Sequence, residues 1–200
     1  MTPLVRPSVL VDIDSTLYDA NKVWCKIFAE VVGIKMTPAD VIIWDYRSRL
    51  VSREVFHALI RDHLHSREGI LARTPYQGAP QALQAWHRRG VKITIASDRA
   101  PDLEGVTRDW LERWHIPFDV LLTDAAIDKV DYAKSHGVTL VIDDKPATIE
   151  AAHTAGLAVA TMLHAYNEPL VRATGVIGSR SWRVIRARVE ATVPGFAQAR

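Results

Sequence analysis

A short aliphatic run near the start of the chain ends abruptly in charge. Val9, Leu10 and Val11 lead directly to Asp12 and Asp14, which stand one residue apart. A continuous apolar run bounded by polar residues is typical of a central parallel strand, because such a strand is covered on both faces. Ligands of open α/β sheets bind just beyond the carboxyl ends of the strands. We therefore expect both aspartates at the mouth of a site.

The spacing of these two aspartates has a chemical consequence. Carboxylates this close repel each other unless a positive charge lies between them. Magnesium is the natural partner, since it takes oxygen ligands and is usually held by one or two carboxylates with waters and phosphate oxygens. A bound cation would also let a carboxylate nucleophile approach an anionic phosphate. Taken alone, Asp12 and Asp14 fit a turn or a helix cap equally well.

From Gly78 onward, predicted helices and strands alternate, and this alternation requires a parallel sheet with right-handed crossovers. Residues 20–76 carry only helical patterns. The sequence predicts an α/β fold: a Rossmann-like parallel sheet with helices on both faces (1–19 and 77–200) and a small helical insertion (20–76) after the first strand. The later strands are predicted at 91–97, 118–124, 139–144 and 157–162, with helices over 80–89, 103–114, 128–136 and 146–155. A loop after His164 leads to a last helix, 181–190.

Within the predicted insertion, apolar residues recur on one helical face from Val23 to Val32 and stop at Gly33, a typical helix end. Thr37 to Asp40 forms a capping-box start for a second, short helix. Ser52 precedes a third helix, whose apolar face is predicted to include Val55, Phe56, Leu59, Ile60 and Leu64.

Composition narrows the classes of function. The chain has 200 residues, with 25 basic and 23 acidic side chains and a net charge of +2, which gives no case for a nucleic-acid polymer as partner. Cys25 is the single cysteine, so no intrachain disulfide can form. The start MTPLVRPS lacks the apolar core of a signal peptide, and no run approaches the ~20 apolar residues of a membrane span. We expect a soluble, cytoplasmic protein; the oligomeric state stays open.

Other polar residues stand at or just beyond the ends of the predicted strands. Ser97 ends one strand, and its hydroxyl could hold a phosphate oxygen with the amides of the next turn. Lys129 begins a helix after another strand, and Asp143 and Asp144 follow a purely aliphatic run. Each alone reads as a turn residue, a surface lysine or a helix cap. Those separate interpretations do not explain why all of these residues lie together at the carboxyl ends of successive strands.

The segments VDIDSTL, ASDR, DKVDYAK and VIDDKP resemble the four motifs of the haloacid dehalogenase superfamily of phosphotransferases. The resemblance covers roughly residues 8 to 162, and the insertion lies where that superfamily places its cap. It implies Asp12 as the nucleophile and Asp14 as the acid and base. It also implies Mg²⁺ held by the Asp12 carboxylate, the Asp14 backbone carbonyl and Asp143, with Asp144 orienting a ligand. Substrate binding would fall to Ser97, Asp98 and Lys129.

The resemblance also suggests the substrate. An aspartate at position 14 points to a phosphatase, and within the superfamily the chain is most similar to the 5'(3')-deoxyribonucleotidases, which hold the base between aromatic residues of the cap. Trp44 and Tyr46 are the candidates here, whereas Trp24 lies on a regular apolar stripe that favours a core position. A nucleoside monophosphate is the expected substrate. The alternatives are a sugar phosphate or other small phosphorylated metabolite, and a non-catalytic binding protein on the same fold.

Two further residues keep alternatives open. Arg99, just past Ser97, either contacts phosphate or pairs with Asp98 or Asp102. His164 follows the last predicted strand and either edges the pocket or belongs to a loop.

Overall fold

A six-stranded parallel sheet forms the centre of the computed structural model, which describes residues 6–124 and 126–197. The strand order is β3-β2-β1-β4-β5-β6, and all neighbouring pairs are parallel. In this doubly wound order, the chain runs outward from β1 to β3 and then crosses back to β4, which pairs with β1 in the middle of the sheet. The predicted α/β class is confirmed. The strands are β1 (Ser8–Val11), β2 (Lys92–Ser97), β3 (Val120–Thr123), β4 (Leu140–Ile142), β5 (Ala158–Met162) and β6 (Ile177–Ser179).

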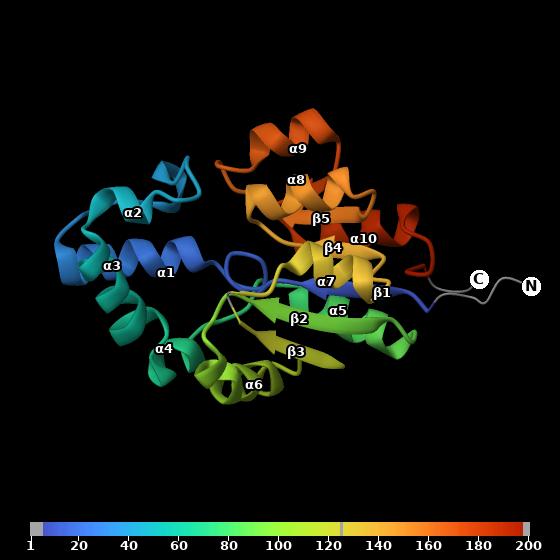
Figure 1. The fold of residues 1–200 in the computed structure, drawn as a ribbon, viewed down its shortest axis with the longest axis horizontal. Helices are drawn as coiled ribbons and strands as arrows, with labels where there is room; N and C mark the ends of the chain where they lie inside the picture. Colours follow the sequence, from blue (N-terminus) through green and yellow to red (C-terminus); the bar gives the residue numbers. More distant parts are fainter. Residues whose placement is uncertain (1–5, 125, 198–200) are drawn as a thin grey trace, which may run out of the picture.

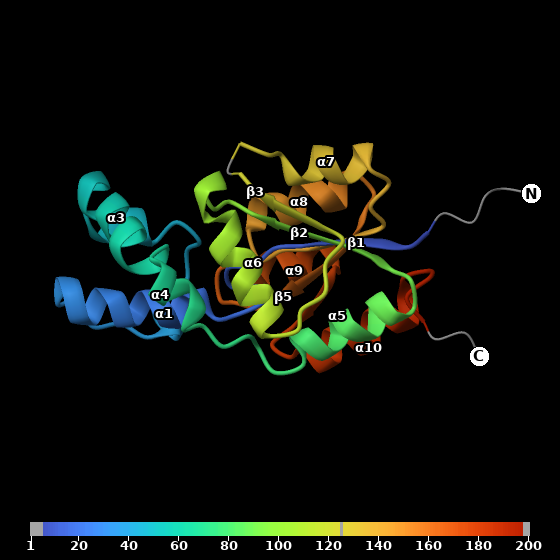
Figure 2. The same cartoon turned by 90° about the horizontal axis from the view of Figure 1, so that it is seen from below.

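Helices cover both faces of the sheet, as the view from below shows (Figure 2). Val9 and Val11 pack into a large core on one face, and Leu10 packs into a smaller core on the other. The strand is therefore apolar on both sides, because neither face meets water. The large core lies under α5 (Ala79–Arg88), α6 (Glu104–Arg113) and α10 (Trp182–Thr192), and the smaller one under α7 (Lys129–Ser135), α8 (Pro146–Thr154) and α9 (Glu168–Thr174).

The helical insertion, residues 20–76, lies beyond the carboxyl ends of the strands, at one end of the sheet (Figure 1). All of it is helix, turn or loop, as predicted. Gly33 ends the first helical stretch with a left-handed backbone (φ 79°), and Thr37 and Ser52 cap the helices that follow them. The elements are α1 (Ala20–Ile27), a π-helical turn (Phe28–Val32), a 3₁₀ turn (Pro38–Asp40), α2 (Arg47–Leu50), α3 (Arg53–Leu59), a second π-helical turn (Ile60–Leu64) and α4 (Arg67–Leu71).

Two positions on the predicted apolar faces of the insertion are corrected. Val31 is 49% exposed and Val55 is 42% exposed. Val31 lies in the first π-helical turn, which has more residues per turn than an α-helix and so rotates the side chains that follow away from the regular stripe.

The segment after β5 also differs from the prediction. The sequence predicted a loop from His164 to the last helix, whereas the structure places α9 and β6 there. β6 has only three residues, and a Cβ at its central Gly178 would lie 2.6 Å from a Val171 side-chain carbon. A strand this short, with a glycine where another chain segment approaches closely, carries no detectable alternation.

Residues 1–5, which include most of the start examined for a signal peptide, lie outside the described residues. Across 6–124 and 126–197, the helices are too short or too polar to cross a bilayer.

Candidate active site

Three aspartate side chains meet beyond the carboxyl ends of β1 and β4. These strands are paired, so Asp12, which follows β1, comes beside Asp143 and Asp144, which follow β4. One carboxylate oxygen from each of the three lies within 4.8 Å of the others, and all three residues are buried. The cluster contains Asp144, which the sequence placed behind the metal ligands, and does not contain the side chain of Asp14.

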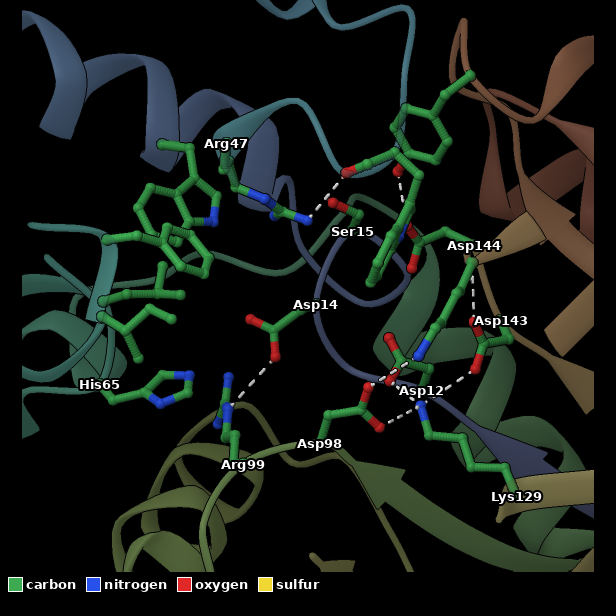
Figure 3. A pocket seen from close by; sticks show the side chains of 17 residues that line it. Asp12, Asp14, Ser15, Arg47, His65, Asp98, Arg99, Lys129, Asp143 and Asp144 are labelled. Carbon is green, nitrogen blue, oxygen red and sulfur yellow. Dashed lines mark hydrogen bonds and ion pairs between the residues drawn. The ribbon is translucent and has the colours of Figure 1, made fainter. Parts of the chain in front are cut away.

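Lys129, the first residue of α7, reaches into this cluster (Figure 3). Its Nζ lies 2.6 Å from Asp12 Oδ1, 3.1 Å from Asp143 Oδ2 and 3.5 Å from Asp98 Oδ1. Burial would lower the pKa of Lys129, but Asp12 and Asp143 outweigh it and hold that pKa well above its usual value. The lysine therefore stays cationic at neutral pH.

One lysine does not balance three buried carboxylates. Burial raises the pKa of Asp12 well above its usual value against the opposing effect of Lys129, and Asp143 and Asp144 raise it further. Burial and the charge of Asp143 raise the pKa of Asp144 to about 7. An all-oxygen set with surplus negative charge fits a hard divalent cation such as Mg²⁺. Asp12, Asp143 and Asp144 are the residues that would hold it.

Asp14 is held separately from the cluster. Its Oδ1 accepts a hydrogen bond from the Tyr18 hydroxyl, and its Oδ2 lies 3.4 Å from Arg99 Nε. Burial would raise the pKa of Asp14, but the charges of Arg99 and Arg73 outweigh burial and hold it below the usual value. Asp14 lines the same cavity as Asp12. It is thus an anchored carboxylate beside the cluster.

Arg99 is buried and forms an ion pair with Asp14. This guanidinium is 1% exposed, and its Nη1 donates to Thr107 Oγ1 at 3.0 Å. Neither of the pairings considered for it, with Asp98 or with Asp102, is formed. Arg99 also lines the cavity, and its Nη2 has no hydrogen-bond partner among the described residues.

A sharp turn connects Asp12 to the insertion. Ser15 adopts a left-handed backbone (φ 60°), which is uncommon for a residue other than glycine and marks a constrained loop. His164 Nε2 donates to the Ser15 carbonyl oxygen at 2.8 Å, and the His164 ring stacks on Tyr166. The Tyr166 hydroxyl donates to Asp144 Oδ2 at 2.5 Å. His164 is therefore a loop residue that supports the turn, and it is absent from the lining of the cavity.

A cavity of about 200 Å³ separates the aspartates from the insertion. In Figure 3, Arg47 and His65 approach it from the insertion, opposite Asp143 and Asp144. The rest of the insertion wall is apolar and consists of Trp24, Trp44, Phe56, Ile60 and Leu64. Trp24 is 2% exposed and stacks on Phe56 with ring centroids 5.5 Å apart, so it belongs to the core as the sequence favoured and also borders the cavity.

Of the two aromatic candidates in the insertion, only Trp44 lines the cavity. Trp44 lines the cavity, between Arg47, whose guanidinium lies 5.5 Å from its ring centroid, and Lys145, whose Nζ lies 4.9 Å from it. Tyr46 is 7% exposed, packs near Phe28 and does not line the cavity. Arg47, which no sequence pattern singles out, has its guanidinium 5.2 Å from the centroid of the Tyr46 ring.

Ser97 and Asp98 lie where β2 ends, next to β1. Asp98 lines the cavity, and Lys145 Nζ lies 3.4 Å from its Oδ2. Ser97 is 3% exposed, and its Oγ has no hydrogen-bond partner among the residues that the structure describes. Ser97 does not line the cavity, whereas the next residue, Asp98, does.

No family model matches the chain. A curated protein of Halalkalibacterium halodurans, named "Putative nucleotidase", is 27% identical over 114 residues, which are 56% of this chain and 57% of that protein. The match thus spans little more than half of either chain.

Comparison of the structure is more decisive. A haloacid dehalogenase (HAD) family hydrolase from Deinococcus radiodurans R1, solved with bound phosphate and sodium, superimposes with a TM-score of 0.64 at 15% identity, over 93% of this chain and 94% of that one. The chain has the HAD hydrolase fold. A "predicted phosphoglycolate phosphatase" from Haemophilus somnus 129pt gives a TM-score of 0.66 at 14% identity, over 92% and 98% of the two chains. At these identities the likeness concerns the fold.

Proposed function

We propose that the chain is a magnesium-dependent phosphomonoester hydrolase that works through an aspartyl-phosphate at Asp12. The observation that carries this proposal is the meeting of Asp12, Asp143 and Asp144 with Lys129 at one cavity that Asp14 also lines. A non-catalytic binding protein on this fold would be expected to lack one of these groups. None of the five is missing from the site.

The reaction would have two halves. A carboxylate oxygen of Asp12 attacks phosphorus in line, and the bond from phosphorus to the ester oxygen breaks. Because Arg99 and Arg73 keep Asp14 ionised in the resting site, Asp14 first takes up the proton of the monoanionic phosphate ester and then gives it to the leaving oxygen. Asp14 then takes a proton from a water molecule whose oxygen attacks phosphorus, which releases phosphate and restores Asp12. Lys129 holds phosphoryl oxygens as their charge redistributes. Mg²⁺ held by the aspartates supplies positive charge that offsets the repulsion between carboxylate and phosphate.

Residues 20–76 would act as a cap over the core formed by 1–19 and 77–200, and the cap would select the leaving group. Trp44 lines the cavity with an aromatic ring, the kind of surface that holds nucleobases by stacking. The name of the Halalkalibacterium halodurans relative agrees with a nucleotide. Together these support a nucleoside monophosphate as the substrate.

Two observations favour a second substrate class, the small phosphorylated metabolites. The cavity volume of about 200 Å³ is below the ~300–1,000 Å³ common for ligand sites, so a nucleotide would require the cap to move outward. Arg47 also faces the cavity without an ion pair among the described residues, whereas Arg99, Lys129 and Lys145 each pair with an aspartate. A small leaving group with an acidic substituent would give Arg47 an anionic partner in addition to its hydrogen bond to the Trp44 carbonyl oxygen.

Phosphate release measured with a panel of nucleoside monophosphates, sugar phosphates and phosphorylated carboxylic acids tests both parts. We expect turnover to stop in chelator and in Asp12→Asn, a variant that removes the nucleophile and leaves the volume of the buried side chain unchanged. The matched control is Asp131→Asn, an exposed aspartate of α7. Near-normal turnover in Asp12→Asn, or activity that persists without divalent cations, would exclude this mechanism. The ranking of the panel decides between the two substrate classes.

A further inference from the structure

The chain passes between the sheet and the insertion twice, and a buried pair of side chains connects the two crossings. Tyr18 precedes the insertion, and Arg73 lies in the last, non-helical segment of the insertion, after α4; they are 1% and 4% exposed. The two crossings are also joined by their backbones, because Tyr76 N donates to the Leu17 carbonyl oxygen at 2.7 Å. A displacement of the insertion relative to the sheet would therefore change the geometry of the contacts between these two crossings.

The buried pair reaches the proposed acid of the reaction. The Tyr18 hydroxyl donates to Asp14 Oδ1, and Arg73 Nη1 donates to the Tyr18 oxygen at 2.9 Å. Arg73 Nη2 donates to the carbonyl oxygen of Leu64. Leu64 belongs to the insertion and lines the active-site cavity. A continuous path of hydrogen bonds therefore runs from the cavity wall of the insertion to one oxygen of Asp14.

The middle of this path is fixed to the sheet domain. The indole N–H groups of Trp110 and Trp114, both carried on or just after α6, donate to the Arg73 carbonyl oxygen at 2.8 and 2.9 Å. The Tyr18 ring meets Trp110 edge-on, with centroids 5.9 Å apart. The Arg73 carbonyl oxygen is thus bonded to the sheet domain, and the Arg73 side chain spans from Tyr18 to Leu64.

The charge of Arg73 needs an explanation that a simple linker contact does not provide. Burying a guanidinium is costly unless it is paired, and within the described residues Arg73 makes no ion pair and leaves its Nε without a partner. Its compensating anion is Asp14, reached through the Tyr18 hydroxyl. A neutral side chain would suffice for packing, whereas a cation strengthens the bond that Tyr18 donates to the carboxylate.

We propose that Tyr18 and Arg73 are positioning residues for Asp14, and that they make its orientation depend on the position of the insertion wall at Leu64. Tyr18 holds Oδ1, so Oδ2, which lies 3.4 Å from Arg99 Nε, would be the oxygen that serves the leaving group. A leaving group that fits against Leu64 keeps the hydrogen bonds from Arg73 to Leu64 and Tyr18 intact. A poorly fitting leaving group displaces Leu64 and weakens these bonds. This inference rests on the proposed phosphatase chemistry and adds to it a link between fit in the insertion and proton transfer.

Leaving-group dependence tests the proposal. p-Nitrophenyl phosphate releases an anion that needs little protonation, whereas an alkyl phosphate such as a nucleoside monophosphate or glycerol phosphate needs the acid. The value of kcat/KM covers the steps through cleavage of the ester bond. In Tyr18→Phe and Arg73→Met we expect kcat/KM for alkyl phosphates to fall about 10- to 100-fold, the worth of a charge-assisted hydrogen bond. For p-nitrophenyl phosphate we expect less than about a threefold change.

Matched controls separate positioning from general damage. Tyr132→Phe removes a hydroxyl from α7, and Arg113→Met removes an exposed arginine that also donates to a carbonyl oxygen of the insertion, that of Leu71. Both should act like the unaltered protein. In an Asp14→Asn background, Tyr18→Phe should have no further effect on alkyl phosphates, because it acts only through Asp14.

Each remaining outcome counts against the proposal. Equal losses on alkyl and aryl phosphates, no loss on either, or a full additional loss in the Asp14→Asn background would show that the pair only supports the fold. If Arg73→Met fails to fold, Tyr18→Phe, which keeps the ring, decides. Failure of the phosphatase proposal is a different result: the unaltered protein would then not hydrolyse p-nitrophenyl phosphate, or Asp12→Asn would hydrolyse it equally well.

Discussion

Replacing Lys129 with methionine removes the single cation at the centre of the aspartate cluster while keeping a long side chain. Lys129 is 8% exposed, and its Nζ contacts Asp12 at 2.6 Å and Asp143 at 3.1 Å. Removing one partner of a buried ion pair costs about 3–5 kcal/mol, because the remaining charges stay buried. For a chain of this size, where about 1 kcal/mol shifts Tm by about 2–4 °C, we expect Tm in chelator to fall by about 6–20 °C.

Magnesium should reverse part of this loss. In the variant, three buried carboxylates no longer share their oxygens with an ammonium group, so Mg²⁺ has no competitor at the cluster. Mg²⁺ at about 100 times its dissociation constant stabilises a folded protein by about 2.7 kcal/mol, and tighter binding adds to this value. We therefore expect Mg²⁺ to raise the Tm of Lys129→Met by more degrees than it raises that of the unaltered protein.

Thermal unfolding followed by circular dichroism, with EDTA and across a Mg²⁺ titration, measures both effects. Lys134→Met is the matched control: Lys134 lies on the same helix, and its 3.8 Å pair with Asp131 is exposed. An exposed pair contributes about 0–1 kcal/mol, so its loss should move Tm little. A Lys129→Met variant as stable as the control in EDTA, or one that Mg²⁺ does not stabilise, would refute the charge balance described for this site.

Three other predictions follow from the same geometry. Ser97→Ala removes a buried hydroxyl that has no partner among the described residues, so the free energy of unfolding should stay within about 0.5 kcal/mol in denaturant titrations; a larger loss would show that the hydroxyl stabilises the fold. Trp44→Ala should raise KM for nucleoside monophosphates about 5- to 100-fold and leave small phosphates unaffected; equal effects on both would remove the stacking role. The folded pKa of Asp144 is raised to about 7. The folded state therefore keeps a proton that the unfolded chain releases near pH ~4, so stability in EDTA should fall as pH rises between these values. Asp144→Asn should flatten that slope.

The placement of the main site residues could be predicted because parallel strands bring their carboxyl ends to one edge. Asp12 follows β1, Ser97 ends β2 and Asp143 follows β4, and these three strands are neighbours in the sheet. Lys129 joins them because it begins the helix whose N-terminus faces the same edge. β1 and β4 end in apolar runs, so the points where they stop are visible in the sequence.

The residues that pattern alone could not place depend on tertiary contacts. Nothing in the spacing of Arg47 shows that it packs near two tryptophans and faces the cavity. Arg99 pairs with Asp14 because the turn at Ser15 brings that carboxylate toward it. Tyr46 looked equivalent to Trp44, but a shift of two residues in an irregular segment sends it into the core of the insertion.

The most direct test of the central claim is chemical trapping of Asp12. The protein is mixed with Mg²⁺ and a ³²P-labelled phosphomonoester that it hydrolyses, quenched in acid, and reduced with borohydride, which converts an aspartyl-phosphate to homoserine. Peptide mass spectrometry then reads position 12. We expect acid-stable, hydroxylamine-sensitive label before reduction and homoserine at position 12 after it, both absent in Asp12→Asn. Turnover without label, or label on another residue, would contradict it.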